Sequence, residues 1–150
     1  MKALFFLLST VIFISSYNSK NNKYVIADTI KPEALQEHPG KKLMETNCNI
    51  CHSPTASEKD RLAPPMIAIK KRYIFKDTTK EEFISDMQNW VKNPNEKEAK
   101  MYGAVRRFGV MTKLPYPEET IEQIADYMFD NEIEQPEWFE EHFQKKSRVN

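Results

Sequence analysis

Cys48-Asn49-Ile50-Cys51-His52 is the stretch that decides how the rest of this chain is interpreted. It contains both cysteines of the sequence, three positions apart, and a histidine follows the second cysteine directly. Two thiols at this spacing can form thioether bonds to the two vinyl groups of one haem, and the next residue then places an imidazole under the iron. The motif therefore predicts a c-type haem attachment site in which Cys48 and Cys51 tether one haem and His52 ligates its iron.

Two other kinds of site use a pair of cysteines at this spacing, namely zinc sites and dithiol redox sites. Zinc would need two further ligands, and the only spare candidates are His38 and His142, because no cysteine remains. A thioredoxin-like dithiol needs strands and helices that alternate around it, and no segment here alternates convincingly as a strand. Haem attachment is the best of the three interpretations.

The N-terminus predicts export. Lys2 precedes an apolar run over residues 3–14, and small polar residues follow it, which is the pattern of a secretory signal peptide. The run is shorter than the roughly 20 residues of a spanning helix, although an uncleaved anchor is the alternative because no Ala-x-Ala site ends it. We expect a signal peptide over residues 1–19, a linker over 20–37 and one domain over 38–146. Export to the periplasm agrees with covalent haem attachment outside the cytoplasm.

The charge balance argues against a nucleic-acid partner. The chain has 22 basic and 22 acidic residues, whereas a nucleic-acid-binding domain would show a basic excess. The distribution is uneven, because residues 118–143 hold ten acidic residues and no lysine or arginine, and basic residues gather in 59–76. Such runs usually form solvated faces, but this asymmetry could steer docking to a partner of opposite charge.

Hydrophobic periodicity predicts three main helices and an amphipathic C-terminal segment. Residues 39–48 form the first, with a proline near its first turn. Thr79 and Glu82 form a capping box ahead of the second, which ends at Asn93 before a proline. The third starts at Glu118, and residues 136–145 form the C-terminal amphipathic extension. The fold class is therefore all-α, with long loops between the three main helices.

Residues 40–131 resemble the monohaem cytochrome c family of bacteria. The likeness rests on Gly40, eight residues before the first cysteine, on the CxxCH motif, and on Ala63-Pro64-Pro65-Met66, which is similar to the family's Gly-Pro-x-Leu loop. Residues 124–127 resemble the family's last helix. The resemblance implies a small cytochrome c fold whose helices and loops wrap around one covalent haem.

The resemblance also implies roles for single residues. The carbonyl of Pro64 would accept a hydrogen bond from the second ring nitrogen of His52 and so fix the orientation of the imidazole. Tyr127 on the last helix would pack beside Gly40 on the first. Ala63 stands where the family has glycine, which puts the tightness of that turn in question.

The sixth iron ligand in this family is usually a methionine on the loop before the last helix. Met111 lies a few residues before that helix, and Met101 lies in the same loop but farther from it. Met66 matches a haem-packing leucine of the family instead. We expect Met111 to be the ligand, with Met101 as the first alternative, and His142, a lysine or an open site as the others.

Three further side chains are candidates for the haem propionates, which need hydrogen-bond donors because they are anionic and partly buried. Arg106 and Arg107 lie in the loop before the last helix. Trp90 offers an indole N–H, but it also lies on the apolar stripe of the second helix, where a core role is the alternative.

These expectations together indicate a monomeric carrier of single electrons with no catalytic residues. Its partners would be envelope redox proteins, with a quinol-oxidising complex or dehydrogenase as donor and a terminal oxidase or reductase as acceptor. A membrane is involved only if the N-terminal segment is retained. One alternative is a dedicated haem subunit of an envelope oxidoreductase complex, suggested by the aromatic side chains in residues 138–143. The other is a five-coordinate haem enzyme or sensor, which would need a vacant distal position.

Overall fold

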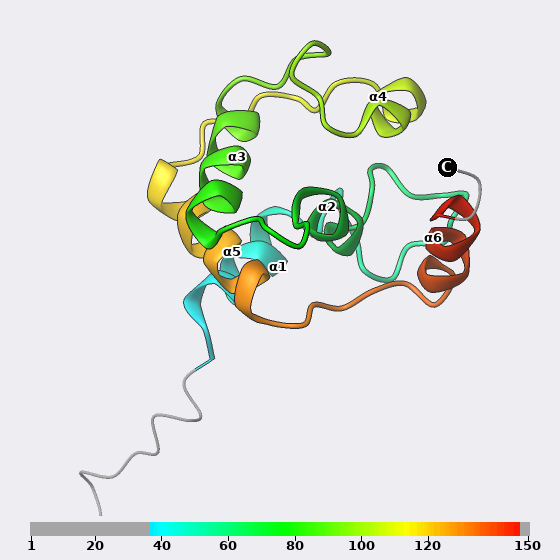
Figure 1. The fold of residues 1–150 in the computed structure, drawn as a ribbon, viewed down its shortest axis with the longest axis horizontal. Coiled ribbons are helices and arrows are strands. Elements are labelled where there is room, and N and C mark those ends of the chain that lie inside the picture. Colours follow the sequence, from blue (N-terminus) through cyan, green and yellow to red (C-terminus); the bar gives the residue numbers. More distant parts are fainter. Residues whose placement is uncertain (1–36, 148–150) are drawn as a thin grey trace, which may run out of the picture. The chain divides into compact units, whose positions relative to one another are not determined.

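The computed structural model describes residues 37–147, so the predicted signal peptide and nearly all of the predicted linker lie outside the described residues. This part of the chain contains helices and no strand, which confirms the predicted all-α class (Figure 1). The helices are α1 (Pro39–Asn47), α2 (Met66–Tyr73), α3 (Lys80–Lys92), α4 (Tyr102–Phe108), α5 (Glu118–Asp130) and α6 (Phe139–Ser147).

Helices α1 and α5 cross at Gly40. A Cβ atom added to Gly40 would lie 1.9 Å from the carbonyl oxygen of Gln123 and 2.8 Å from the Cβ of Tyr127. Only a residue without a side chain allows the two helices to approach this closely. The predicted contact between Gly40 and Tyr127 is therefore confirmed. Helix α3 packs on α5 as well, as Figure 1 shows.

The hydrophobic core lies where α1, α2, α3 and α5 meet. Phe83 on α3 and Ile124 and Met128 on α5 are its largest fully buried side chains. The Phe83 ring contacts the rings of Tyr73 and Phe129, with centroids 6.5 and 6.0 Å apart. Burying one such side chain contributes about 1.5–3 kcal/mol, so the apolar stripes of α3 and α5 position the first helix and, through it, the cysteine motif that follows.

The predicted capping box begins α3. The Thr79 hydroxyl accepts a hydrogen bond from the backbone N–H of Glu82 at 3.2 Å, and the Glu82 carboxylate accepts one from the N–H of Thr79 at 2.9 Å. The two side chains thus accept hydrogen bonds from two backbone N–H groups that have no partner within the helix.

Thr79→Ala should lower the free energy of unfolding by about 1 kcal/mol, the usual cost of losing an N-terminal cap. Denaturant titration of the two proteins measures the difference. Thr79→Ser keeps the hydroxyl and serves as the control, so a serine variant as unstable as the alanine variant would contradict this explanation.

Two short helices lie in segments that the sequence pattern assigns to long loops, so the prediction of only three main helices was incomplete. Helix α2 begins after Pro65 without a side-chain cap and buries Met66, Ile67 and Tyr73. Helix α4 has seven residues, none of them buried, and no side-chain cap. Helices of this length depend on tertiary contacts rather than on local signals, which explains why periodicity did not reveal them.

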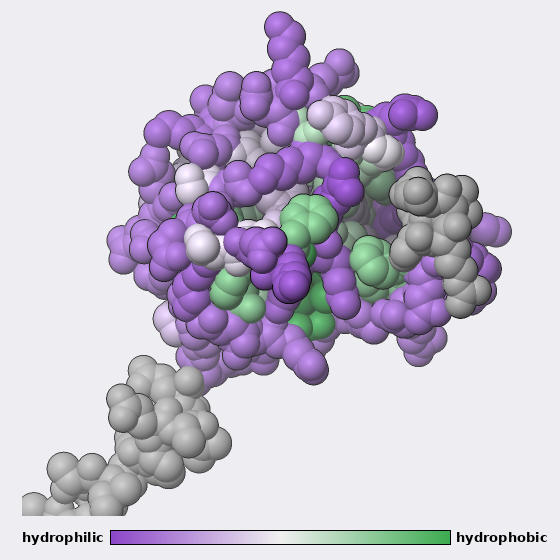
Figure 2. Space-filling view, in the orientation of Figure 1, coloured by the Kyte–Doolittle hydropathy of each residue, from purple (hydrophilic) through white to green (hydrophobic). Residues whose placement is uncertain are grey.

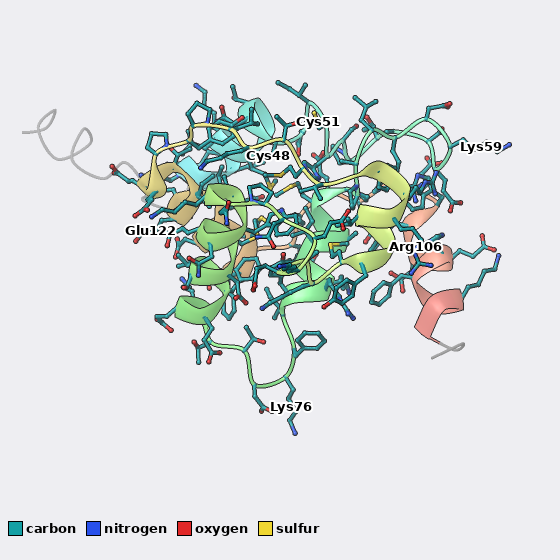
Figure 3. The ribbon with its side chains drawn as sticks, turned by 90° about the horizontal axis from the view of Figure 1, so that it is seen from above. Cys48, Cys51, Lys59, Lys76, Arg106 and Glu122 are labelled. Carbon is teal, nitrogen blue, oxygen red and sulfur yellow. The ribbon has the colours of Figure 1, made fainter. Side chains whose placement is uncertain are left out.

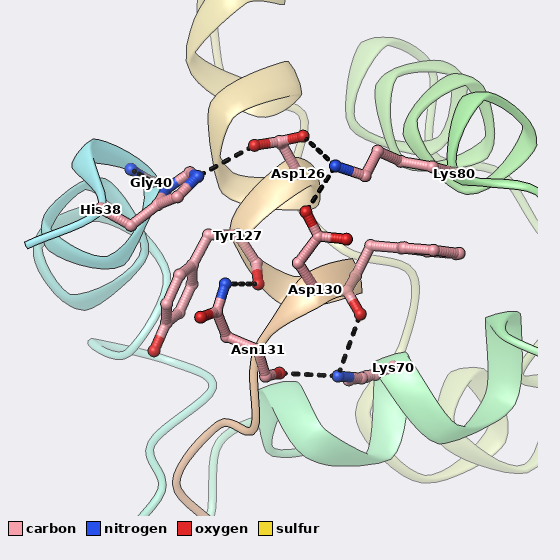
Figure 4. A network of polar contacts seen from close by, with 9 residues as sticks. His38, Gly40, Lys70, Lys80, Asp126, Tyr127, Asp130 and Asn131 are labelled. Atoms are coloured by element: carbon pink, nitrogen blue, oxygen red, sulfur yellow. Dashed lines mark hydrogen bonds and ion pairs between the residues drawn. The ribbon is translucent and has the colours of Figure 1, made fainter. Parts of the chain in front are cut away.

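A network of polar side chains joins α1, α3 and α5 (Figure 4). The Nδ1 atom of His38 accepts the N–H of Gly40 at 3.1 Å, and its Nε2 lies 2.9 Å from the carboxylate of Asp126. Lys80 donates to Asp126 at 2.7 Å and to Asp130 at 2.5 Å. The bond from Lys80 holds the pKa of Asp126 below its usual value. These groups are partly exposed, so the network orients the helices more than it stabilises them.

Lys70 joins α2 to the end of α5 (Figure 4). Its ammonium group donates to the carbonyls of Asn131 at 2.7 Å and of Phe129 at 3.5 Å. The last carbonyls of a helix lack partners within the helix and carry a partial negative charge, which a cation stabilises. Burial lowers the pKa of Lys70. This contact fixes the direction of the chain that follows α5.

The surface of the domain is mostly polar in the view of Figure 2, with separate apolar patches. Within residues 37–147, no helix is both long enough and apolar enough to span a lipid bilayer.

Candidate functional site

The CxxCH motif forms a tight turn at the end of α1. Cys48 is the C-cap of the helix, and its carbonyl accepts the backbone N–H groups of Cys51 and His52 at 3.1 and 2.8 Å. Figure 3 shows Cys48 and Cys51 close together at this end of α1. Cys48 is half-buried against the core and Cys51 is exposed, and neither forms a disulfide. The turn therefore presents two free thiols beside one imidazole.

The thiol of Cys48 differs from the nucleophile of a dithiol redox site. Burial, with a smaller contribution from Cys51, raises the pKa of Cys48 to about 11. Redox dithiols instead have a nucleophilic cysteine whose pKa is depressed. The raised pKa argues against Cys48 as the nucleophile of such a pair.

The zinc alternative is weakened as well. No cluster of three or more His, Cys, Asp or Glu residues in the described part of the chain could hold a metal ion. The two spare histidines have other partners, because His38 contacts Asp126, and Nδ1 of His142 lies 2.7 Å from the carboxylate of Glu58.

The imidazole of His52 is half-buried, and the loop after the motif fixes its orientation. Its Nδ1 lies 2.6 Å from the carbonyl oxygen of Pro64. A carbonyl can only accept, so Nδ1 carries the proton and Nε2 keeps its lone pair. Burial lowers the pKa of His52, although the bond to Pro64 opposes this effect. The result is a neutral imidazole whose Nε2 can bind a metal, oriented by a carbonyl as metal-binding histidines are. The contact implied by the resemblance is present.

This donor set fits a covalently attached haem. Cys48 and Cys51 could supply two thiols for the vinyl groups of a haem, and Nε2 of His52 could supply a nitrogen ligand for its iron. The iron needs no further protein carboxylates or thiolates, since four of its ligands come from the porphyrin.

Residues 107–116, which we call the strap, are attached at both ends to the chain around the motif. At one end, Nη2 of Arg107 donates to the carbonyl of Glu58 at 2.9 Å. At the other end, the hydroxyl of Tyr116 donates to the carbonyl of Asn47 at 3.2 Å. Burial, with smaller contributions from the two cysteine thiols, raises the pKa of Tyr116. Met111 lies between these two attachments.

Met111 also differs from the other described methionines in its packing. It is half-buried and is not among the side chains of the core or those packed against it. Gly109, with a φ of 80°, ends α4 and directs the chain into the segment that carries Met111. The core and the side chains packed on it include Met44, Met66, Met87, Met101 and Met128.

The two arginines proposed for the propionates lie in different settings. Arg107 donates to Glu58, and its guanidinium lies 5.0 Å from the centre of the Phe108 ring. Arg106 is exposed on α4 (Figure 3). Arg107 thus already has protein partners, whereas Arg106 faces solvent.

Trp90 is half-buried on α3 and lines a cavity of about 360 Å³. Tyr73 and Lys100 lie in the same lining, but the motif residues and Met111 do not. Trp90 and the motif residues thus do not line this cavity together, and a role of Trp90 beside the haem stays a prediction.

The C-terminal extension packs back on the loop that follows the motif. The indole N–H of Trp138 donates to the carbonyl of Ala56 at 2.9 Å, and Phe139 is 3% exposed. The guanidinium of Arg61 lies 4.5 Å from the centre of the Trp138 ring. The sequence reasoning missed Arg61 and Glu58, because nothing in the local pattern distinguishes them from surface charges.

Comparison of this chain with models of protein families, with curated proteins and with solved structures finds no match.

Proposed function

We propose that this protein is an exported monohaem c-type cytochrome that carries single electrons between redox proteins. The observation that carries the proposal is the hydrogen bond between Nδ1 of His52 and the carbonyl of Pro64, beside two free thiols. It leaves Nε2 as a ligand directly after the second cysteine, which is the arrangement that a tethered haem requires. The small cytochrome c fold is part of this proposal.

Each residue of the site has a separate task. Cys48 and Cys51 would hold the haem by thioether bonds, and His52 and Met111 would ligate its iron. When bound, the haem supplies a one-electron ferric–ferrous couple. With Met111 as a ligand, the iron would have no open position for a substrate. Methionine as the second axial ligand raises the reduction potential relative to a second histidine.

The surface around the motif is suited to brief contact with a partner. Ile50, inside the motif, is 73% exposed, and Leu62, in the loop that follows it, is 70% exposed. A contiguous exposed apolar patch marks a surface where proteins dock, whereas single exposed apolar side chains are common, and the proposal takes Ile50 and Leu62 as two parts of such a patch. We propose that donor and acceptor proteins of the bacterial envelope dock here, with charge setting the rate of encounter.

The test is the absorption spectrum of the protein produced with a c-type haem attachment system. We expect haem that stays on the chain after denaturation, a low-spin spectrum, and the long-wavelength ferric band that marks a methionine–iron bond. A chain with Cys48→Ala and Cys51→Ala is the control and should carry no covalent haem. A wild-type chain without covalent haem would overturn the proposal.

The same spectrum distinguishes the other haem functions. A high-spin ferric spectrum with rapid binding of carbon monoxide to the reduced protein would indicate the five-coordinate enzyme or sensor. Co-purification of the native protein with one fixed partner would indicate a dedicated subunit. The packing of Trp138 and Phe139 on their own domain leaves those rings less available for such a partner.

A further inference from the structure

Glu58, six residues after His52, contacts two helices that lie far from it in the sequence. Its carbonyl accepts hydrogen bonds from Arg107 at 2.9 Å and from Arg61. Its carboxylate lies 2.7 Å from Nδ1 of His142 on α6. Figures 1 and 3 show α4 and α6 on the same side of the domain as this loop. Glu58 therefore connects the start of the strap to the C-terminal extension.

The guanidinium of Arg61 lies between rings of those same two segments. Its central carbon is 4.5 Å from the ring centre of Trp138, in the C-terminal extension, and 5.5 Å from that of Phe108, in the strap. Its Nε is buried and has no hydrogen-bond partner. Burial and the nearby Arg107 lower the pKa of Arg61. Arg61 is thus a partly desolvated cation that two aromatic rings, the Glu58 carbonyl and the charge of the Glu58 carboxylate stabilise.

We propose that Trp138 is a positioning residue for the strap. It acts through Arg61, whose guanidinium also contacts Phe108, to hold the first residues of the strap, and so limits how readily Met111 leaves the iron. The proposal rests on the proposed function, because it assigns to the C-terminal extension the control of ligand exchange at the same haem.

The physical reason lies in two guanidinium groups that share one carbonyl. Arg61 and Arg107 repel each other, and the Trp138 ring offsets part of that repulsion by its contact with Arg61. Without this ring, Arg61 becomes hydrated and moves away from Phe108. The strap then keeps the hydrogen bonds from Arg107 and Tyr116 but loses the contact between Phe108 and Arg61, so its first residues open more readily.

The experiment measures how fast imidazole displaces methionine from the ferric iron of the full-chain holoprotein. In Trp138→Leu, displacement should be about tenfold faster than in the wild type, the factor expected for one partly desolvated cation–π contact. Trp138→Phe keeps a ring over Arg61 and should lie closer to the wild type. Gln144→Ala, an exposed position on α6 whose side chain bonds only within the helix, should match the wild type.

The outcomes separate this inference from the proposed function. Equal displacement rates in Trp138→Leu and the wild type, with methionine bound in both, would overturn the inference and leave the electron carrier intact. Absence of covalent haem in the wild type would overturn the carrier itself.

A second measurement does not depend on haem. Amide hydrogen exchange of residues 107–116 should be faster in Trp138→Leu than in the wild type and in Gln144→Ala, whether or not haem is attached. Unchanged exchange in this segment would show that Trp138 does not hold the strap, and would also overturn the inference. This readout keeps the test decisive if Trp138→Leu loads haem poorly.

Discussion

Replacing Met111 by leucine is expected to remove the methionine–iron bond and to lower the reduction potential by on the order of 0.1 V, a fraction of the ≈ 0.8 V range that axial ligands set. Leucine has nearly the volume of methionine, so packing changes little. It has no sulfur, however, and the thioether favours the ferrous state. The ferric spectrum and a redox titration measure the two effects, and carbon monoxide should then bind to the reduced variant.

Met101→Leu is the matched control, with the same substitution in the same stretch of chain. Met101 precedes α4 and packs against the core, and the carbonyl of its neighbour Lys100 accepts a hydrogen bond from Arg72 at 2.8 Å. We therefore expect this variant to keep both the ferric band and the potential. If Met101→Leu loses the band and Met111→Leu keeps it, the assignment of the ligand is wrong. If both keep it, the sixth ligand is another methionine.

The parts of the structure that could be predicted are those with a local signature. The capping box at Thr79 needs two residues three apart, and the apolar stripes of α3 and α5 follow one helical period. The CxxCH turn also lies within five consecutive residues. The contact between Gly40 and Tyr127 spans many residues, and it was predicted only because the chain resembles a known family at both positions.

The parts that could not be predicted depend on distant contacts. Helix α4 buries no residue. Just before it, the carbonyl of Lys100 accepts a hydrogen bond from Arg72, and near its end Arg107 donates one to the carbonyl of Glu58. Both partners lie far away in the sequence. The bond from Trp138 to Ala56 joins positions 82 residues apart. In the sequence, a charged residue such as Glu58 resembles any solvated surface group. Its partners become its neighbours only in the folded chain, and no periodic sequence pattern predicts these contacts.

Gly40→Ala is expected to lower the free energy of unfolding by about 2 kcal/mol or more. Alanine favours a helix by up to about 1 kcal/mol over glycine, but the added Cβ would lie 1.9 Å from the carbonyl oxygen of Gln123. That oxygen belongs to the backbone of α5, so the helices must separate, and overpacking of this kind costs typically 1–3 kcal/mol and occasionally more. Denaturant titration measures the loss. Because α1 leads directly into Cys48, the yield of covalent haem should fall as well.

Gly103→Ala provides the matched control, since Gly103 also lies in a helix, α4, but a Cβ added there meets no atom within 4 Å. Only the gain in helix propensity remains at this position, so the free energy of unfolding should stay the same or rise by up to about 1 kcal/mol. The Gly40 variant should therefore lose stability, whereas the Gly103 variant should not. A Gly40→Ala protein as stable as Gly103→Ala would mean that α1 and α5 do not cross at Gly40, and the placement of the cysteine motif on the domain would have to be revised.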